Sequence, residues 1–351
     1  MRTELAILRA LGGLLATALI TASCSSGGGP ASHGSNDTLS SSPSSTAQAE
    51  VKVTHTKLPP IQSLTKAHAI PIKATQDVDW ALVAYGKAWI KGVGKGIGIF
   101  DAKTGRPLGS VRVAQGPCAA MDAAYGSIWT ATCDTQGVAR INGRTGRMTG
   151  FTKTAVSDGE STIGAGEGGV WIATSGKDCT SCVIARIDPK TMKVVDRFPV
   201  PVATAVRVGL GGVWVTDSDD STVLRLDPST GDVVATIPVG REPRFFDVGS
   251  GGVWVMDQLD GSLCQIDPSD NAVVGCPVID RGGVEGGDLV VGNGYVWFRG
   301  SDELVAQIDP KTGKVLRRIG APQGSGSVGA GSGQLWITAH DVSKIYRIPV
   351  H

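Results

Sequence analysis

The sequence predicts an all-β protein, a seven-bladed β-propeller with four-stranded antiparallel blades, whose ring is closed by an N-terminal strand in the C-terminal blade. Three observations predict it. Seven of the eight tryptophans recur about every 40 residues, a glycine stands three residues before each of those seven, and an Asp-Pro turn follows most of them. Internal similarity at a period of roughly 40–45 residues is typical of propeller blades.

The tryptophan repeat sets the register of the blades. The glycines are Gly86, Gly126, Gly168, Gly211, Gly251, Gly294 and Gly333, and the tryptophans are Trp89, Trp129, Trp171, Trp214, Trp254, Trp297 and Trp336. A glycine at a constant offset indicates a tight turn, because such turns need backbone angles that glycine adopts easily. We therefore expect each tryptophan on the second strand of a hairpin, packed between blades rather than against a ligand.

A second turn follows the tryptophan strand in most repeats. Its clearest copies start at Asp188, Asp227, Asp267 and Asp309, each followed by proline, and looser copies start at Asp101 and Asn142. Asp followed by Pro is typical of a type I turn, which would close a second hairpin. In the fifth repeat we expect strands at 244–248, 253–256, 262–267 and 271–278. Seven such sheets stacked radially leave only short edges.

The last repeat lacks an outer strand of its own. After Trp336 one further strand is expected, from Lys344 to Ile348, and no fourth strand follows it. Ahead of the first repeat, the segment Ala69 to Lys73 resembles Thr236 to Gly240, which ends an outer strand. Residues 67 to 73 are therefore predicted to complete the C-terminal blade and to join both ends of the ring in one sheet.

The N-terminal residues predict export and lipidation. Residues 1–23 are interpreted as a lipoprotein signal peptide, because Ala10 to Ala22 is uncharged and too short to span a bilayer. Ala22 and Ser23 directly before Cys24 resemble a lipobox, although Thr21 stands where Leu, Ile or Val is usual; the alternative is a secretory signal with an incidental cysteine. Cys24 would then carry palmitate and anchor the chain on the extracytoplasmic face of the bacterial cell membrane.

The domain boundaries follow from composition. Residues 24–66 are rich in Ser, Gly and Pro, and few aliphatic residues precede Val51. Such a segment buries too little apolar surface to offset the entropy lost on ordering, so we predict a disordered tether. Residues 67–351 are predicted to form the propeller.

Six cysteines remain after Cys24, and an even number in an exported chain favours disulfides. In the repeat register Cys118 lies beside Cys133 and Cys264 beside Cys276, while Cys179 and Cys182 share an insertion. Three local bridges are the simplest assignment, although six cysteines allow 15 pairings. Cys179 and Cys182 form a CxxC that could instead serve redox or metal chemistry, but a zinc site would need two further ligands.

Charge and motif content argue against several function classes. A net charge of +1, with no run of more than two adjacent basic residues, argues against nucleic-acid binding. The glycine-rich stretches at 92–98 and 324–333 lack a phosphate-loop pattern, and no nucleophile elbow, HExxH or EF-hand motif is present. Of five histidines only His340 lies within a blade. We therefore assign no catalytic residue, expect no cofactor, leave any metal unassigned and expect a monomer.

Candidate ligand-binding residues lie on the face that carries the connections between blades, at the mouth of the central channel. They are Arg207, Asp217, Arg241, Arg244, Asp260 and Glu285. Asp122, Arg207 and Asp247 fall on inner strands and are expected to line the channel. Carboxylates outnumber arginines on this rim, which favours a cation, a sugar or a basic peptide as ligand. A solvated surface without a ligand is the simpler alternative.

The recurring pattern, clearest from Gly211 to Gly240, resembles the YVTN-type propeller superfamily and the blades of the virginiamycin B lyase family. The resemblance covers about residues 67 to 351 and resides in turn and packing positions. It implies the propeller fold and, for the lyases, a metal-dependent elimination that opens a cyclic peptide antibiotic with histidines on the rim. Quinoprotein dehydrogenases share a tryptophan-containing blade motif, but usually with eight blades.

Two function classes follow. The first is a membrane-anchored extracytoplasmic propeller that acts as a binding or scaffold module for a cell-envelope peptide, glycan or protein. The second is a lyase or hydrolase of the virginiamycin B lyase type with a metal held by rim carboxylates. A cluster of Asp residues and His340 around one divalent ion would favour the second, and scattered rim charges would favour the first.

Overall fold

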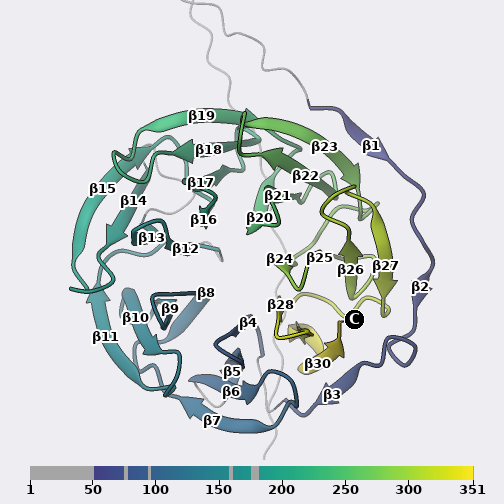
Figure 1. Ribbon diagram of the computed structural model, residues 1–351, viewed down its shortest axis with the longest axis horizontal. Helices are drawn as coiled ribbons and strands as arrows, with labels where there is room; N and C mark the ends of the chain where they lie inside the picture. The colour runs from purple at the N-terminus through teal and green to yellow at the C-terminus, as the bar shows by residue number, and fades with distance from the viewer. Residues whose placement is uncertain (1–50, 75–77, 94–95, 158–160, 175–181, 351) are drawn as a thin grey trace, which may run out of the picture. The chain divides into compact units, whose positions relative to one another are not determined.

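The computed structural model describes residues 51–74, 78–93, 96–157, 161–174 and 182–350, which form a ring of seven blades (Figure 1). In the first four blades the first strand lies nearest the axis and the last strand at the outer edge, whereas in the other three the outermost strand is one that precedes blade 1 in the sequence. Within the described ranges, no helix has the length and apolar character needed to cross a bilayer. The predicted all-β, seven-bladed fold is confirmed.

The first four blades each consist of four consecutive antiparallel strands. Blade 1 is β4 (Ala81–Ala84), β5 (Lys87–Val93), β6 (Gly96–Asp101) and β7 (Pro107–Val111), and blade 2 is β8 (Pro117–Ala124), β9 (Ser127–Thr132), β10 (Gly137–Asn142) and β11 (Met148–Lys153). Blade 3 is β12 (Ile163–Gly166), β13 (Gly169–Ala173), β14 (Cys182–Ile187) and β15 (Val194–Val200), and blade 4 is β16 (Ala205–Gly209), β17 (Gly212–Asp217), β18 (Thr222–Leu226) and β19 (Val233–Pro238).

The remaining three blades each take in a strand from the N-terminal side. Blade 5 is β20 (Pro243–Gly249), β21 (Gly252–Asp257), β22 (Ser262–Asp267) and β23 (Ala272–Val278), with β1 (Val53–His55) as a fifth strand. Blade 6 is β24 (Asp288–Gly292), β25 (Tyr295–Arg299), β26 (Val305–Ile308) and β27 (Val315–Ile319), with β2 (Ile61–Gln62). Blade 7 is β28 (Val328–Gly331), β29 (Gln334–Ala339), β30 (Lys344–Pro349) and β3 (Ile70–Ile72), and the 3₁₀ turn η1 (His340–Val342) precedes β30.

The predicted ring closure is confirmed by the pairing of β3. This strand lies antiparallel to β30, with Ile70 opposite Arg347 and Ile72 opposite Ile345. The expected strands of blade 5 also agree with β20 to β23 to within one or two residues. The alternation of apolar and polar residues and the turn chemistry were sufficient to place these elements.

The predicted tether extends too far toward the C-terminus. Residues 51 to 73, which we call the strap, run along the outside of blades 5, 6 and 7 (Figure 1). β1 pairs in parallel with β23, and β2 pairs in parallel with β27. The physical reason is that a segment pairing with an existing sheet edge needs only a few aliphatic side chains to become ordered. Val51 and Val53 pack against the core of blade 5, and Leu64 packs against that of blade 6. Residues 1–50 lie outside the described residues.

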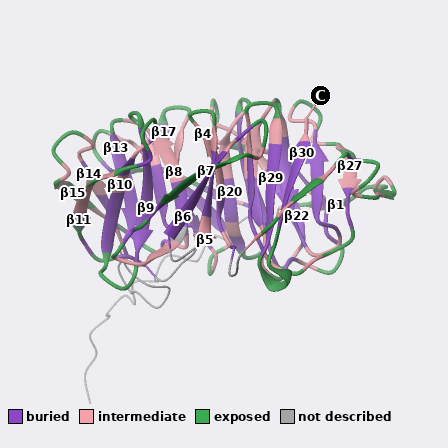
Figure 2. Cartoon of the chain, turned by 90° about the horizontal axis from the view of Figure 1, so that it is seen from below, coloured by how far each residue is buried: buried purple, intermediate pink, exposed green. Residues whose placement is uncertain are grey.

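Tryptophans fill the spaces between blades, as predicted. All seven repeat tryptophans are at most 1 % exposed, and the blades are buried except at their loops and outer edges (Figure 2). In blades 1 to 6 the indole N–H donates to a carbonyl near the end of the inner strand of its own blade, for example to Gly209 from Trp214 at 3.0 Å. Trp336 instead donates to Ala102 of blade 1 at 3.0 Å, a buried bond across the closure.

The hairpin before each tryptophan is a two-residue turn with positive φ at both positions. In blade 4 these residues are Leu210 (φ 52°) and Gly211 (φ 72°). Such a type I′ turn matches the twist of the flanking strands, which accounts for the constant glycine. In blade 3 the first turn residue also links neighbouring blades, since the Glu167 carboxylate accepts the N–H of Gly211 at 3.1 Å.

An arginine clamp, which sequence reasoning missed, joins neighbouring blades. Opposite the tryptophan in blades 2, 3 and 4 stand Arg140, Arg186 and Arg225, whose guanidinium groups lie 5.0–5.6 Å from the indole. Each donates to the carbonyl of the proline in the Asp-Pro turn of the next blade, at 2.7–3.2 Å. Arg347 of blade 7 donates to the carbonyl of Lys103, one residue further along the corresponding turn of blade 1.

Two disulfides agree with the simplest assignment. Cys118 is bonded to Cys133 and Cys264 to Cys276. Cys182 is also disulfide-bonded, whereas Cys179 lies outside the described residues.

Candidate functional site

The central channel holds a small charged chamber. A cavity of about 70 Å³ is lined by inner strands of the ring and contains Asp122, Arg207, Asp247 and Asp288 among its walls. Asp122, Arg207 and Asp247 occupy equivalent positions, each opposite its own blade's tryptophan. The prediction that these three residues line the channel is confirmed, and Asp288 joins them from blade 6.

The chamber carboxylates connect neighbouring blades. Asp122 accepts the N–H groups of Ala123 in its own blade and of Ala165 in blade 3, both at 2.7 Å. Asp247 of blade 5 likewise accepts the N–H of Val248 at 2.9 Å and of Val291 in blade 6 at 2.7 Å. Because their oxygens are occupied by backbone donors, these carboxylates act first as connectors of the inner strands.

Burial makes the chamber sensitive to pH. Desolvation raises the pKa of Asp247 and of Asp288 to about 6, against the opposing effect of the nearby Arg207 charge and of the hydrogen bonds. Desolvation also raises the pKa of Asp122. A raised carboxyl pKa means that the folded protein binds protons that the unfolded chain, titrating near 3.9, does not yet bind.

The free energy of unfolding should therefore increase as the pH falls from 7 to 5, by about 1 kcal/mol for each of Asp247 and Asp288. Below about pH 4 the gain stops, because the unfolded chain then binds these protons too. Urea denaturation at pH 5, 6 and 7 measures this dependence. The Asp247→Asn protein should show a shallower dependence, and equal dependence in both proteins would contradict the assignment.

Trp80, the tryptophan outside the repeat, lies between the chamber and an outer pocket. It is 6 % exposed, and its ring lies 6.3 Å from that of Phe245 in blade 5, across the axis. The Arg244 guanidinium lies 5.9 Å from the centroid of the Phe245 ring. Trp80 lines both the chamber and an outer pocket of about 180 Å³, so it separates the two.

Two adjoining pockets hollow this face outside Trp80. The larger, of about 470 Å³, is lined by Glu242, Arg244, Gln258, Glu285 and the glycine-rich connection 282–286. The pocket of about 180 Å³ is lined by Asp79, Trp80, Ser325, Ser327 and His340, and both pockets share Gly286. We call the two together the rim groove. Its walls offer carboxylates, a guanidinium, hydroxyls and backbone amides to a ligand.

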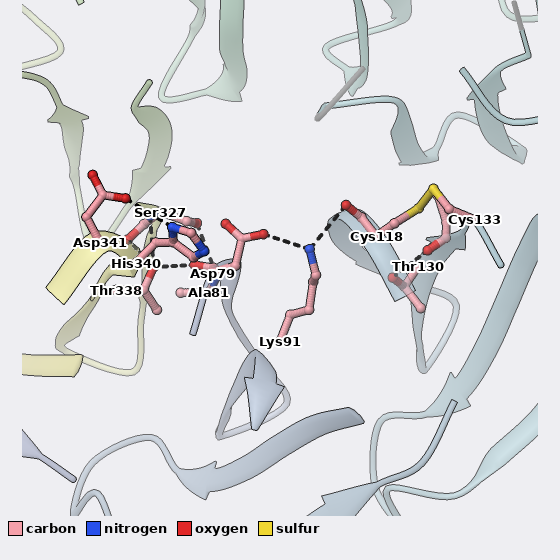
Figure 3. A network of polar contacts seen from close by, with 11 residues as sticks. Asp79, Ala81, Lys91, Cys118, Thr130, Cys133, Ser327, Thr338, His340 and Asp341 are labelled. Carbon is pink, nitrogen blue, oxygen red and sulfur yellow. Dashed lines mark hydrogen bonds and ion pairs between the residues drawn. A yellow bond between two sulfur atoms is a disulfide. The ribbon is translucent and has the colours of Figure 1, made fainter. Parts of the chain in front are cut away.

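Around the smaller pocket, a polar network spans blades 7, 1 and 2 (Figure 3). The Lys91 ammonium lies 2.7 Å from the Asp79 carboxylate and donates to the Cys118 carbonyl at 3.1 Å. His340 Nδ1 lies 3.0 Å from Asp341 Oδ1, and the Ser325 hydroxyl donates to the same oxygen at 2.9 Å. Asp341 thus orients the His340 ring at the pocket wall.

The structure distributes the six predicted rim residues over four places. Arg244 and Glu285 line the rim groove, and Arg207 lies in the chamber. Arg241 and Asp260 form an ion pair of 2.6 Å beside a groove next to the strap. Asp217 is buried and accepts the N–H groups of Asp219 and Asp220, and burial raises its pKa.

The residues that sequence reasoning missed are Trp80, Asp79, Phe245 and Asp288. For Trp80 a signal existed, because it is the one tryptophan that breaks the repeat. For Asp79, Phe245 and Asp288 the sequence gives no such signal, because closure of the ring, and not a local sequence pattern, brings them to the channel.

Among the described residues, one group of three potential metal ligands comes together: Asp257, Cys264 and Cys276. Its two sulfurs are bonded to each other, so their lone pairs are not those of thiolate ligands. Asp257 is buried, its pKa is raised well above the usual range by desolvation, and it accepts the Ser262 hydroxyl. The rim carboxylates and His340 are not part of such a cluster in the described structure.

The fold is shared with solved propellers. A streptogramin B lyase structure superposes with a TM-score of 0.65 at 14 % identity, covering 81 % of this chain and 97 % of that one. Virginiamycin B lyase from Staphylococcus aureus gives 0.64 at 14 %, with 81 % and 99 % covered. BamB from Moraxella catarrhalis gives 0.52 at 13 %, with 77 % and 82 % covered.

No family model matches the chain, and no curated protein matches its sequence significantly. Identities of 13–14 % carry the fold and not the chemistry of the site. The chain is thus a seven-bladed β-propeller similar in architecture to the streptogramin B lyases.

Proposed function

We propose that the chain is a binding module of the cell envelope, anchored through a lipidated Cys24 on the extracytoplasmic face of the membrane, which holds a peptide, glycan or protein partner in the rim groove. The observation that carries the proposal is the rim groove itself, two adjoining pockets with charged and polar walls on one face of the ring. The chamber inside Trp80 measures only about 70 Å³, so the groove outside it, with pockets of about 470 and 180 Å³, is the larger concave surface for a partner.

The larger pocket of the groove has the volume and the charged walls of a binding site. Glu242 and Glu285 stand with Arg244 around an open pocket of about 470 Å³, a volume within the range of about 300–1,000 Å³ typical of ligand sites. Pairs of opposite charges on such a surface favour a partner of mixed charge and set its orientation.

The test is quantitative partner recovery from envelope extracts with the anchored protein. Arg244→Ala with Glu285→Ala should reduce recovery at least tenfold, which corresponds to about 1.4 kcal/mol. Arg241→Ala, which alters the neighbouring groove beside the strap, is the matched control and should leave recovery unchanged. Equal recovery by all three proteins would reject the rim groove. Fatty-acid labelling of the wild type but not of Cys24→Ala tests the anchor.

The alternative activity rests on the His340–Asp341 contact at the wall of the smaller pocket. A general base oriented by a carboxylate is one requirement of a lyase or hydrolase. Opening of virginiamycin B by the purified protein with Mg²⁺, lost in His340→Gln, would replace the binding proposal with this one.

A further inference from the structure

The arginine opposite the tryptophan is missing from blades 1, 5 and 6. The residue opposite the tryptophan is Gln265 in blade 5, where blades 2, 3, 4 and 7 carry arginine. At the seam after blade 1, Lys87 supplies bonds instead, donating to the carbonyls of Gly143 and Arg144 in blade 2. In blade 6, Gln307 accepts a hydrogen bond from Arg317 of the same blade. Among the described residues, no cation lies over Trp297, and at the seam after blade 5 none lies over Trp254.

A cleft occupies the space at this seam. It has a volume of about 410 Å³ and lies between blade 5, the turn that begins β27 of blade 6, and the strap. Trp254 and Leu263, both at most 1 % exposed, form its inner end, and Val274 and Val315 line it nearer the surface. At Gly275 an added side-chain carbon would meet no atom within 4 Å, which shows how open the wall is there.

The entrance of the cleft is basic. Lys57 of the strap and Lys314 of blade 6 both line it, both are exposed, and neither forms an ion pair within the described structure. Thr54, Thr56 and Thr312 add hydroxyls to the same entrance. No carboxylate lines the cleft. An apolar interior with two ammonium groups at its entrance, neither of them in an ion pair with a described residue, complements a molecule that is apolar at one end and anionic at the other.

We propose that the cleft between blades 5 and 6 binds a small amphiphilic anion, one acyl chain or ring system that carries a single carboxylate or sulfonate group. The apolar part lies against Trp254 and Leu263, and the anionic head lies between Lys57 and Lys314. Because Lys57, Thr54 and Thr56 belong to the strap, the ligand also contacts the segment that leads to the N-terminal residues. This site is separate from the rim groove, so neither proposal depends on the other.

The probe for the experiment is dodecanoate, titrated below its micelle concentration into the purified protein and followed by isothermal titration calorimetry. One molecule should bind per chain. Lys57→Glu with Lys314→Glu should weaken binding at least tenfold, whereas Lys311→Glu, on the same turn but outside the cleft, should not. Dodecylammonium, with the same chain and the opposite charge, should show no saturable binding.

Gly275→Leu tests the apolar part of the site. The residue has ordinary strand geometry and space for a side chain, so the variant should keep the thermal midpoint of the wild type and lose dodecanoate binding. Unchanged binding in this folded variant, or equal binding of dodecylammonium, would overturn the proposal. Lysine-dependent binding to phosphatidylglycerol vesicles without binding of monomeric dodecanoate would also overturn it, since a membrane surface would then be what the lysines recognise.

Discussion

A chain that begins at residue 75 should fail to fold cooperatively. Without β3, the edge of β30 is unpaired, and Ala67, Ile72 and Ala74 no longer cover the cores that contain Tyr346 and Trp336. The bond from Trp336 to Ala102 across the closure then joins blades 7 and 1 without a complete sheet on one side. We expect a loss of at least 5 kcal/mol, comparable with the whole stability of a typical domain, about 5–15 kcal/mol.

Urea denaturation followed by tryptophan fluorescence and near-ultraviolet circular dichroism measures this loss. Deletion of residues 25–47, which precede the strap, is the control and should leave the transition midpoint unchanged. A synthetic peptide of residues 61–74 should restore the transition of the truncated chain, and a scrambled peptide should not. A truncated protein with the midpoint of the wild type would show that β3 does not hold the ring together.

Arg207→Gln should destabilise the protein at pH 7 by about 3–5 kcal/mol, the usual result of removing one partner from a buried set of charges. Arg207 is the positive charge that opposes the raised pKa of Asp122, Asp247 and Asp288. Its guanidinium also donates to the Ile163 carbonyl at 3.0 Å, so the variant loses a bond between blades 3 and 4.

The size of this effect should depend on pH. At pH 5 Asp247 and Asp288, whose pKa values are raised to about 6, are largely protonated, so the destabilisation by Arg207→Gln should be smaller than at pH 7. Asp247→Asn in the same chain should recover part of the loss at pH 7, which a double-mutant cycle measures. An equal loss at both pH values, with no coupling to Asp247, would assign the role of Arg207 to its hydrogen bonds alone.

The blades could be predicted from the sequence because each of their determinants is local. Each repeat contains a glycine at the second position of a type I′ turn, and a tryptophan on the second strand of the blade. An Asp-Pro turn follows in most repeats, so the copies support one another. Closure by Ile70 to Ile72 could be predicted as well, because that segment resembles Ile237-Pro238-Val239 of an outer strand. β1 and β2 could not, since two or three residues on a preformed edge leave no periodic pattern.

The site was less accessible to sequence reasoning because it depends on distances across the ring. Trp80 and Phe245 meet across the axis from blades 1 and 5, and no local feature of either segment indicates the contact. Arg241 and Asp260 were predicted as ligand-binding residues but neutralise each other, because the neighbouring loops of blade 5 bring them within 2.6 Å. The missing clamp at Gln265 becomes visible only when the strand register shows which residue faces each tryptophan.

The route of the strap has a consequence for how the protein is made. Blade 7 combines an early segment with a late one, as the bond from Thr338 to the Asp79 carbonyl, 259 positions apart, also shows. During synthesis, Ile70 to Ile72 must therefore remain unpaired until β30 has emerged. Such distant pairings slow folding and leave apolar edges open meanwhile. We expect the nascent chain to rely on a holding chaperone until its final strands are released.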